Sequence, residues 1–262
     1  MLEVRDLRFR HKGQKEEVLK GISFVANPGE ITTILGPNGA GKSTIFKCIT
    51  GIWRNYQGDI LINQKKIDNS SFRKRARFFS VVPQEHVPPF SYSVFDVVLT
   101  GRASYVGLLS SPGKQDYLKA EEVLKLVGIF HIKDVPYTKI SGGERQLTLI
   151  ARALVQEAPV IILDEPISHL DFRNQFLILT KIKKIVKERK LIALMSLHDP
   201  NLASIFSDEV VIIKKGKIIH NGDPREVLTE EVLRDVYEVK IKVINYNGVN
   251  LVFPEIKEKW EK

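Results

Sequence analysis

The sequence predicts an α/β protein with a mainly parallel sheet, an antiparallel β-subdomain at its N-terminus and an inserted α-helical subdomain. Two observations predict it. The short β-branched or apolar runs at residues 31–35 and 160–163 are typical of parallel strands buried on both faces; the first leads into a glycine-rich segment and the second into paired carboxylates. A long stretch between them, residues 91–156, has mainly helical patterning and is expected to be a helical block within the α/β chain.

The other elements follow from alternation and turn residues. Residues 4–9 alternate like a strand, and Pro28-Gly29 turns the chain before the strand at 31–35. Strands at 59–62 and 78–82 enclose a basic helix, and later strands are expected from 191, from 210 and at 217–220. Asp223-Pro224 opens a short helix, and residues 240–254 are expected to form a hairpin around Asn247-Gly248.

A glycine-rich segment follows the first buried strand and precedes a helix expected at residues 42–50, which Gly51 ends. The segment consists of Gly36, Pro37, Asn38, Gly39, Ala40, Gly41, Lys42 and Ser43, with Thr44 next. Its glycines allow successive backbone N–H groups and the helix N-terminus to face an anion. Lys42 adds a positive charge for β and γ phosphates, and Ser43 a hydroxyl ligand for Mg²⁺. The order strand, loop, helix therefore predicts a nucleotide-phosphate site.

Paired carboxylates follow the strand at residues 160–163. The C-terminal end of a parallel strand is where α/β proteins bind ligands, so Asp164 is placed to hold the hydration shell of Mg²⁺. Glu165 is the candidate general base for an attacking water. His198 follows another apolar run, residues 191–197, whose end is expected to lie beside Asp164.

The segment Ser141-Gly142-Gly143-Glu144 reads as a capping box ahead of an amphipathic helix. The buried stripe expected on this helix is Leu147, Ile150, Ala151, Leu154 and Val155. Capping does not require two glycines, whose small size lets another molecule approach the helix N-terminus. Two phosphate-binding helix ends and one glycine loop suggest that this second end completes a site on another copy of the chain.

Together these residues resemble the nucleotide-binding subunit of ABC transporters over nearly the whole chain. The family's signature is similar to residues 141–146, its Q-loop to Gln84 after Val82-Pro83, its D-loop to residues 168–171 and its switch histidine to His198. The signature has Ile140 where leucine is commonest and Glu144 where many members have glutamine.

The resemblance implies specific roles. ATP and Mg²⁺ are bound by the loop, while Ser141, Gly142, Gly143 and Asp171 act across a head-to-tail dimer. Gln84 reaches Mg²⁺ and the attacking water, and His198 holds the γ phosphate. Two residues, His11 and Phe9, lie near the position of the aromatic residue that stacks on adenine in the family, and both are candidates for that contact.

The resemblance also implies a division of the chain and its partners. It gives one ABC ATPase domain at 1–262, with a P-loop core at 1–90 and 157–225, a helical subdomain at 91–156 and a C-terminal extension at 226–262. Pro83, Pro88, Pro89 and Phe90 mark where the family receives a helix of the transmembrane permease. A substrate-binding protein is an indirect partner.

Composition sets outer limits. The chain has 262 residues, 43% of them hydrophobic and 27% charged, which is ordinary for a globular protein. No apolar run approaches the roughly 18 residues of a membrane span, so a peripheral place on the cytoplasmic face of the membrane is expected. The single cysteine, Cys48, excludes an internal disulfide. The net charge of +9 is best explained by basic residues on solvated helix faces, and next by contact of these residues with anionic lipid headgroups. No specific nucleic-acid partner is expected.

Several motifs are similar to the ABC branch that imports iron chelates, haem, cobalamin and related metal compounds. They are residues 100–102, 141–146, 168–172 and 198–201. An importer for phosphonate, molybdate or another substrate stays open. A soluble ABC ATPase, for example one of iron-sulfur assembly, is the alternative of a different class, and partner identity distinguishes the two.

Overall fold

The computed structural model describes residues 1–67, 71–84, 92–107 and 110–255. Its first layer is an antiparallel sheet in the order β2-β1-β4-β5. The strands are β1 (Leu2–Phe9), β2 (Leu19–Ala26), β4 (Tyr56–Ile62) and β5 (Lys65–Lys66). Leu2, Val4, Leu7 and Phe9 of β1 are buried, with a register shift between Val4 and Leu7, so one face of this sheet contributes to a core. The expected antiparallel N-terminal subdomain is confirmed.

The central sheet has six strands in the order β10-β9-β3-β8-β7-β6. They are β3 (Ile31–Leu35), β6 (Phe79–Val82), β7 (Val160–Leu163), β8 (Ile192–Leu197), β9 (Glu209–Lys214) and β10 (Lys217–Gly222). All neighbouring pairs are parallel except β9 and β10. Every residue of β3, β7 and β8 is buried, as the unbroken runs predict, and the mainly parallel sheet is confirmed.

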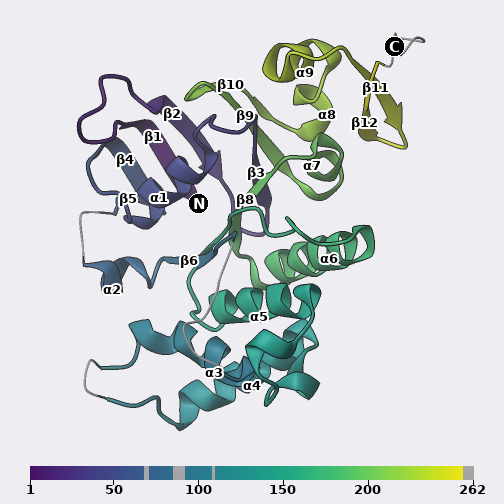
Figure 1. Cartoon of the computed structure of the whole chain (residues 1–262). Helices are drawn as coiled ribbons and strands as arrows, with labels where there is room; N and C mark the ends of the chain where they lie inside the picture. Colours follow the sequence, from purple (N-terminus) through teal and green to yellow (C-terminus); the bar gives the residue numbers. More distant parts are fainter. Residues whose placement is uncertain (68–70, 85–91, 108–109, 256–262) are drawn as a thin grey trace.

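Helix α1 (Lys42–Thr50) packs in the core between the two sheets, and Gly51 ends it with a left-handed backbone. Helices α6 (Phe172–Arg189) and α7 (Pro200–Phe206) belong to the second core cluster, and the short α2 (Phe72–Arg75) precedes β6. In Figure 1 these helices flank the sheet, so the carboxyl ends of its parallel strands are left for loops.

The helical block lies at the bottom of Figure 1, beyond β6 and α6. It contains α3 (Val94–Leu99), η1 (Thr100–Ser104), α4 (Lys114–Val127), η2 (Phe130–Ile132), η3 (Tyr137–Lys139) and α5 (Gly142–Leu154). The expected stripe of α5 is buried throughout. Of the four residues expected at the entrance to this block, Pro88, Pro89 and Phe90 lie outside the described residues.

The C-terminal part packs on α7. It consists of α8 (Pro224–Val227), α9 (Glu230–Tyr237) and the hairpin of β11 (Ile241–Tyr246) and β12 (Val249–Pro254). Asn201 exchanges two hydrogen bonds with the backbone of Val252, at 3.1 and 2.6 Å. Asn247 and Gly248 both have positive φ at the hairpin turn, as that dipeptide predicts. Across the described part of the chain, no helix combines the length and the apolar character needed to cross a membrane.

Candidate nucleotide site

The glycine loop joins the end of β3 to the start of α1. At Gly36 an added Cβ would lie 2.2 Å from the carbonyl oxygen of Ile213, so only glycine lets these two backbones approach. Gly41 caps α1 with φ of 112°, a conformation that side chains disfavour. The loop therefore depends on glycine for its path, and it delivers the N-terminus of a nine-residue helix, where unpaired N–H groups favour an anion.

Lys42 lies inside this loop. Its Nζ donates to the carbonyl oxygens of Gly36 at 2.7 Å and Pro37 at 3.1 Å, and only 6% of the residue is exposed. Burial lowers the pKa of Lys42, and the carboxylates of Glu165 and Asp164 oppose that shift. A buried ammonium group that donates to two carbonyl oxygens is well placed to move onto a phosphate, which is a stronger partner.

Asp164 connects the end of β7 to the loop. Its Oδ1 accepts hydrogen bonds from Ser43 Oγ at 3.3 Å and from Ser196 Oγ at 2.8 Å. A carboxylate beside a hydroxyl is the hard oxygen donor set that Mg²⁺ prefers. Two of the three residues that the sequence predicts for Mg²⁺, Ser43 and Asp164, therefore lie together and fit the ion, whereas Gln84, the third, donates to Glu165.

Glu165 lies between two of the other predicted residues. Its Oε1 is 2.6 Å from Nε2 of His198, and its Oε2 accepts from Nε2 of Gln84 at 2.7 Å. Gln84 follows β6, Glu165 follows β7 and His198 follows β8, so three parallel strands bring these side chains to one edge. Glu165 has φ of 51°, an uncommon backbone for a residue with a side chain.

The N-terminus of α5 has the predicted capping box. Ser141 accepts from the Glu144 backbone N–H, and Glu144 Oε2 accepts from the Ser141 N–H at 2.8 Å and its Oγ at 2.7 Å. These hydrogen bonds lower the pKa of Glu144. Ser141 and Gly142 are exposed, whereas Gly143 is buried against Asn174. Among the described residues, no hydrogen bond joins residues 141–143 to the loop of the same chain.

Asp171 serves its own helix in this structure. Its carboxylate caps α6 by accepting from the backbone N–H of Asn174 at 2.8 Å and from Nδ2 of the same residue at 2.9 Å. Phe172, the next residue, has 76% of its surface exposed. The start of α6 and the start of α5 are thus both open to solvent in the single chain and lie side by side, because Gly143 is packed against Asn174.

The two candidates for the adenine contact differ in exposure. Phe9 is only 3% exposed, and its ring stacks on Trp53 with a centroid separation of 4.8 Å. His11 is half-buried and meets both rings edge-on, at 4.9 Å from Phe9 and 4.7 Å from Trp53. Phe9 is therefore a core residue of this cluster, and His11 is the more accessible of the two.

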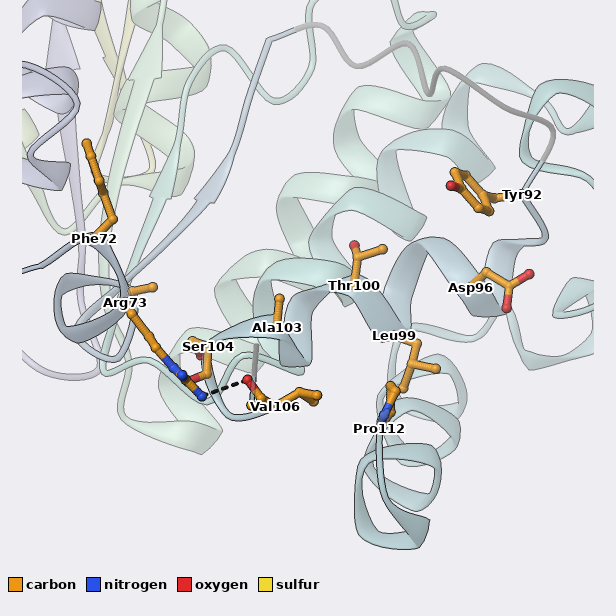
Figure 2. Close-up of a pocket in the computed structure, with 12 residues that line it drawn as sticks. Phe72, Arg73, Tyr92, Asp96, Leu99, Thr100, Ala103, Ser104, Val106 and Pro112 are labelled. Atoms are coloured by element: carbon orange, nitrogen blue, oxygen red, sulfur yellow. Dashed lines mark hydrogen bonds between the residues drawn. The ribbon is translucent and has the colours of Figure 1, made fainter. Parts of the chain in front are cut away.

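A groove of about 880 Å³ lies between α2 and the α3–η1 segment. Figure 2 shows it lined by apolar side chains from both sides, among them Phe72, Leu99 and Ala103. Arg73 closes one end by donating to the carbonyl oxygens of Ser104 at 3.1 Å and Val106 at 2.6 Å. The sequence offered no signal for this groove, because its walls come from segments well apart along the chain.

Comparisons with known proteins agree with this site. Residues 19–168 match the family model described as ABC transporter. A Helicobacter pylori protein named as an iron chelatin transport ATP-binding protein is 33% identical over 254 residues, which are 97% of this chain and 99% of the relative. The molybdate import ATP-binding protein of Haemophilus influenzae is 32% identical and covers 91% of this chain and 88% of its own length.

Solved structures give the same result. A transporter described as metal-chelate type, in an inward-facing conformation, superposes with a TM-score of 0.84 at 30% identity and covers 98% of both chains. A dimeric ATP-binding cassette bound to ADP and Pi has a TM-score of 0.73 at 25% identity over 86% of this chain and 99% of that one. The chain belongs to the ABC transporter family, as one of its ATP-binding and ATP-hydrolysing subunits.

Proposed function

We propose that this chain powers an importer of a metal chelate, acting as a pair of copies beneath membrane-spanning subunits. The observation that carries the ATP-hydrolysing part of the proposal is the meeting of Gln84, Glu165 and His198, with the Glu165 carboxylate close enough to the glycine loop to oppose the burial that lowers the pKa of Lys42. A site that only holds a nucleotide does not need a carboxylate between Gln84 and His198, whereas a site that activates a water molecule needs a base such as Glu165.

Each group has a role that its position supports. The loop residues 36–44 and Lys42 hold the phosphates of ATP, and Ser43 with Asp164 holds Mg²⁺, which when bound neutralises phosphate charge. Glu165 accepts the proton of the attacking water. His198 and Gln84 orient that water and the γ phosphate once they leave the Glu165 carboxylate.

The second copy supplies what one chain lacks. Ser141, Gly142 and Gly143 stand at an open helix N-terminus, which suits the γ phosphate of ATP held by another copy. Asp171 lies at the start of the neighbouring helix and joins the same interface. His11 contacts the adenine of ATP on its own chain. The dimeric cassette among the similar structures supports this pairing.

The apolar groove is the proposed contact with a transmembrane permease subunit. Its walls belong to the core on one side and to the helical block on the other (Figure 2), so a helix seated there touches both parts at once. Contact with a permease places the chain at the cytoplasmic face of the membrane, and a substrate-binding protein completes the importer.

The metal-chelate substrate is supported by the names of two similar proteins, the iron chelatin subunit and the metal-chelate type transporter. Molybdate is the second candidate, favoured by the Haemophilus influenzae relative. Selectivity lies in the other subunits, so the partner decides between them.

Purification from the native cell tests this function. The tagged chain is solubilised in mild detergent with ATP, and the expected result is a polytopic membrane protein in matching amount. Ala103→Arg, an exposed residue of the groove, should abolish that copurification while the isolated ATPase stays active. Leu118→Arg, on an exposed face of α4 outside the groove, is the matched control. Recovery of soluble partners alone would contradict the importer.

A further inference from the structure

Ser196 occupies an unusual place in the central sheet. It is the penultimate residue of β8, pairs with Ile34 of β3 and is completely buried. The other residues of this strand are Ile, Ala, Leu, Met and Leu. A single hydroxyl in such a run has no water to bind, so its hydrogen-bonding groups must be satisfied by protein.

Both hydrogen bonds of the Ser196 hydroxyl go to the paired carboxylate residues, Asp164 and Glu165. The hydroxyl donates to Oδ1 of Asp164 at 2.8 Å and accepts from the backbone N–H of Glu165 at 2.8 Å. The side chain of Ser196 thus connects one carboxylate group with the main chain of the next residue. Its one proton is used, and so is one of its lone pairs.

The two bonds have different consequences. The first fixes Oδ1 of Asp164, which also accepts from Ser43, and leaves Oδ2 without a hydrogen bond from any described residue. The second holds the backbone of Glu165, whose φ of 51° costs about 1 kcal/mol in an ordinary residue and needs support from its surroundings.

We infer that Ser196 is a positioning residue for ATP hydrolysis, which orients Asp164 toward Mg²⁺ and sets the direction of the Glu165 side chain. The inference rests on the proposed roles of Asp164 and Glu165. Both of its hydrogen bonds go to Asp164 and Glu165, so the role assigned to Ser196 is exerted through these two residues and not by direct contact with ATP or the metal.

The test compares Ser196→Ala with Ser207→Ala. Ser207 is also buried, and its Oγ donates to Oγ1 of Thr33 at 2.6 Å, so this control loses a buried hydroxyl contact outside the site. Mn²⁺ is the probe: its binding in the presence of ATP is measured by electron paramagnetic resonance, and the Mg²⁺ dependence of ATPase activity is measured in parallel.

Ser196→Ala is expected to weaken Mn²⁺ binding about tenfold, since a hydrogen bond to a carboxylate is lost. It should also lower kcat at saturating Mg²⁺ without changing ATP binding in the absence of metal. Ser207→Ala should change neither quantity, and Ser196→Thr, which keeps the hydroxyl, should recover much of the Mn²⁺ affinity. Wild-type Mn²⁺ binding and wild-type Mg²⁺ dependence in Ser196→Ala would overturn the inference.

Asp164→Asn separates this inference from the proposed function. If Asp164→Asn weakens Mn²⁺ binding and Ser196→Ala does not, only the role of Ser196 is wrong. If Asp164→Asn itself binds Mn²⁺ normally, the proposed metal role of Asp164 is wrong.

Discussion

Nε2 of His198 lies 2.6 Å from Oε1 of Glu165. The other oxygen of that carboxylate accepts from Gln84 at 2.7 Å. A general base must hydrogen-bond the water that it activates, yet both oxygens of Glu165 are engaged by protein here. A carboxylate oxygen can accept a second hydrogen bond, so the attacking water either joins these partners or replaces one of them. We expect the arrival of ATP and of the second copy to rearrange the contacts of Glu165, because Gln84 and His198 then have the γ phosphate as an alternative partner.

Glu165→Gln tests the assignment of the base. The substitution keeps the size of the side chain but removes its ability to accept a proton, so turnover should fall by about a hundredfold or more. ATP binding should persist, because the loop and Lys42 are untouched. Steady-state ATPase assays and nucleotide titration measure the two effects separately. Normal turnover in this variant would remove Glu165 from the mechanism.

Mixed dimers test whether the signature acts on the partner's ATP. Lys42→Ala and Ser141→Arg are placed either on the same copy or on different copies, with two affinity tags to isolate the mixed species. In a head-to-tail dimer, placing the two substitutions on different copies leaves one ATP site intact. Placing both on one copy, with a wild-type partner, leaves no intact site. About half of the wild-type ATPase activity is expected in the first case and almost none in the second. If the doubly substituted copy with a wild-type partner is instead the more active dimer, each chain completes its own site.

Much of the fold could be predicted because its signals are local. The helix at 42–50 ends at Gly51, and the C-terminal hairpin turns at Asn247-Gly248, because these residues favour positive φ in any context. Buried parallel strands were visible as runs without alternation. The nearness of His198 to the paired carboxylates also followed, since they come after neighbouring strands of one parallel sheet.

The rest depends on contacts between distant segments. Ser196 lies in an apolar run, and nothing in that run shows that its hydroxyl reaches the two residues that follow the neighbouring strand β7. The pairing of Phe9 with Trp53, which buries Phe9, joins residues 44 positions apart (53 − 9). The apolar groove needs the helical block in its folded place. No periodicity or turn signal carries that information.

Arg102→Ala should destabilise the helical block. Arg102 has 5% of its side chain exposed and donates to Asp116 Oδ1 and Glu157 Oε2, both at 2.8 Å, and to the carbonyl oxygen of Val155 at 2.9 Å. Removing Arg102 leaves the charges of Asp116 and Glu157 without their partner, and we expect the free energy of unfolding to fall by about 2–3 kcal/mol. The loss is smaller than for a fully buried pair because the half-exposed Glu157 can be solvated by water. Urea denaturation measures it, and Arg5→Ala, in an exposed pair with Glu3, is the control.

The same variant should change the response to acid. The hydrogen bond from Arg102 lowers the pKa of Asp116 below its ordinary 3.8, with a smaller contribution from the Gly113 N–H. A depressed carboxyl pKa stabilises the fold above the ordinary value and loses that effect as pH falls below it. The stability difference between wild type and Arg102→Ala should therefore be constant near neutral pH and shrink below about pH 4. A difference that stays constant into acid would contradict the role of this pair.

Cys48 should be unreactive until the protein unfolds. Its thiol is fully buried, and burial raises its pKa from 9.0 to about 12, while the charge of Arg75 opposes the shift more weakly. Because the thiolate is the reactive form, alkylation by iodoacetamide at pH 9 should be slower than in the unfolded chain by a factor of several hundred or more. Ser111→Cys, at an exposed position, supplies a thiol that should react at the ordinary rate.

The raised pKa of Cys48 also means that folding stability falls as pH rises from about 9 to 12, because only the unfolded chain ionises the thiol in that range. Rapid alkylation of Cys48 in the folded protein would show that α1 opens without global unfolding, and would contradict its place in the core between the two sheets.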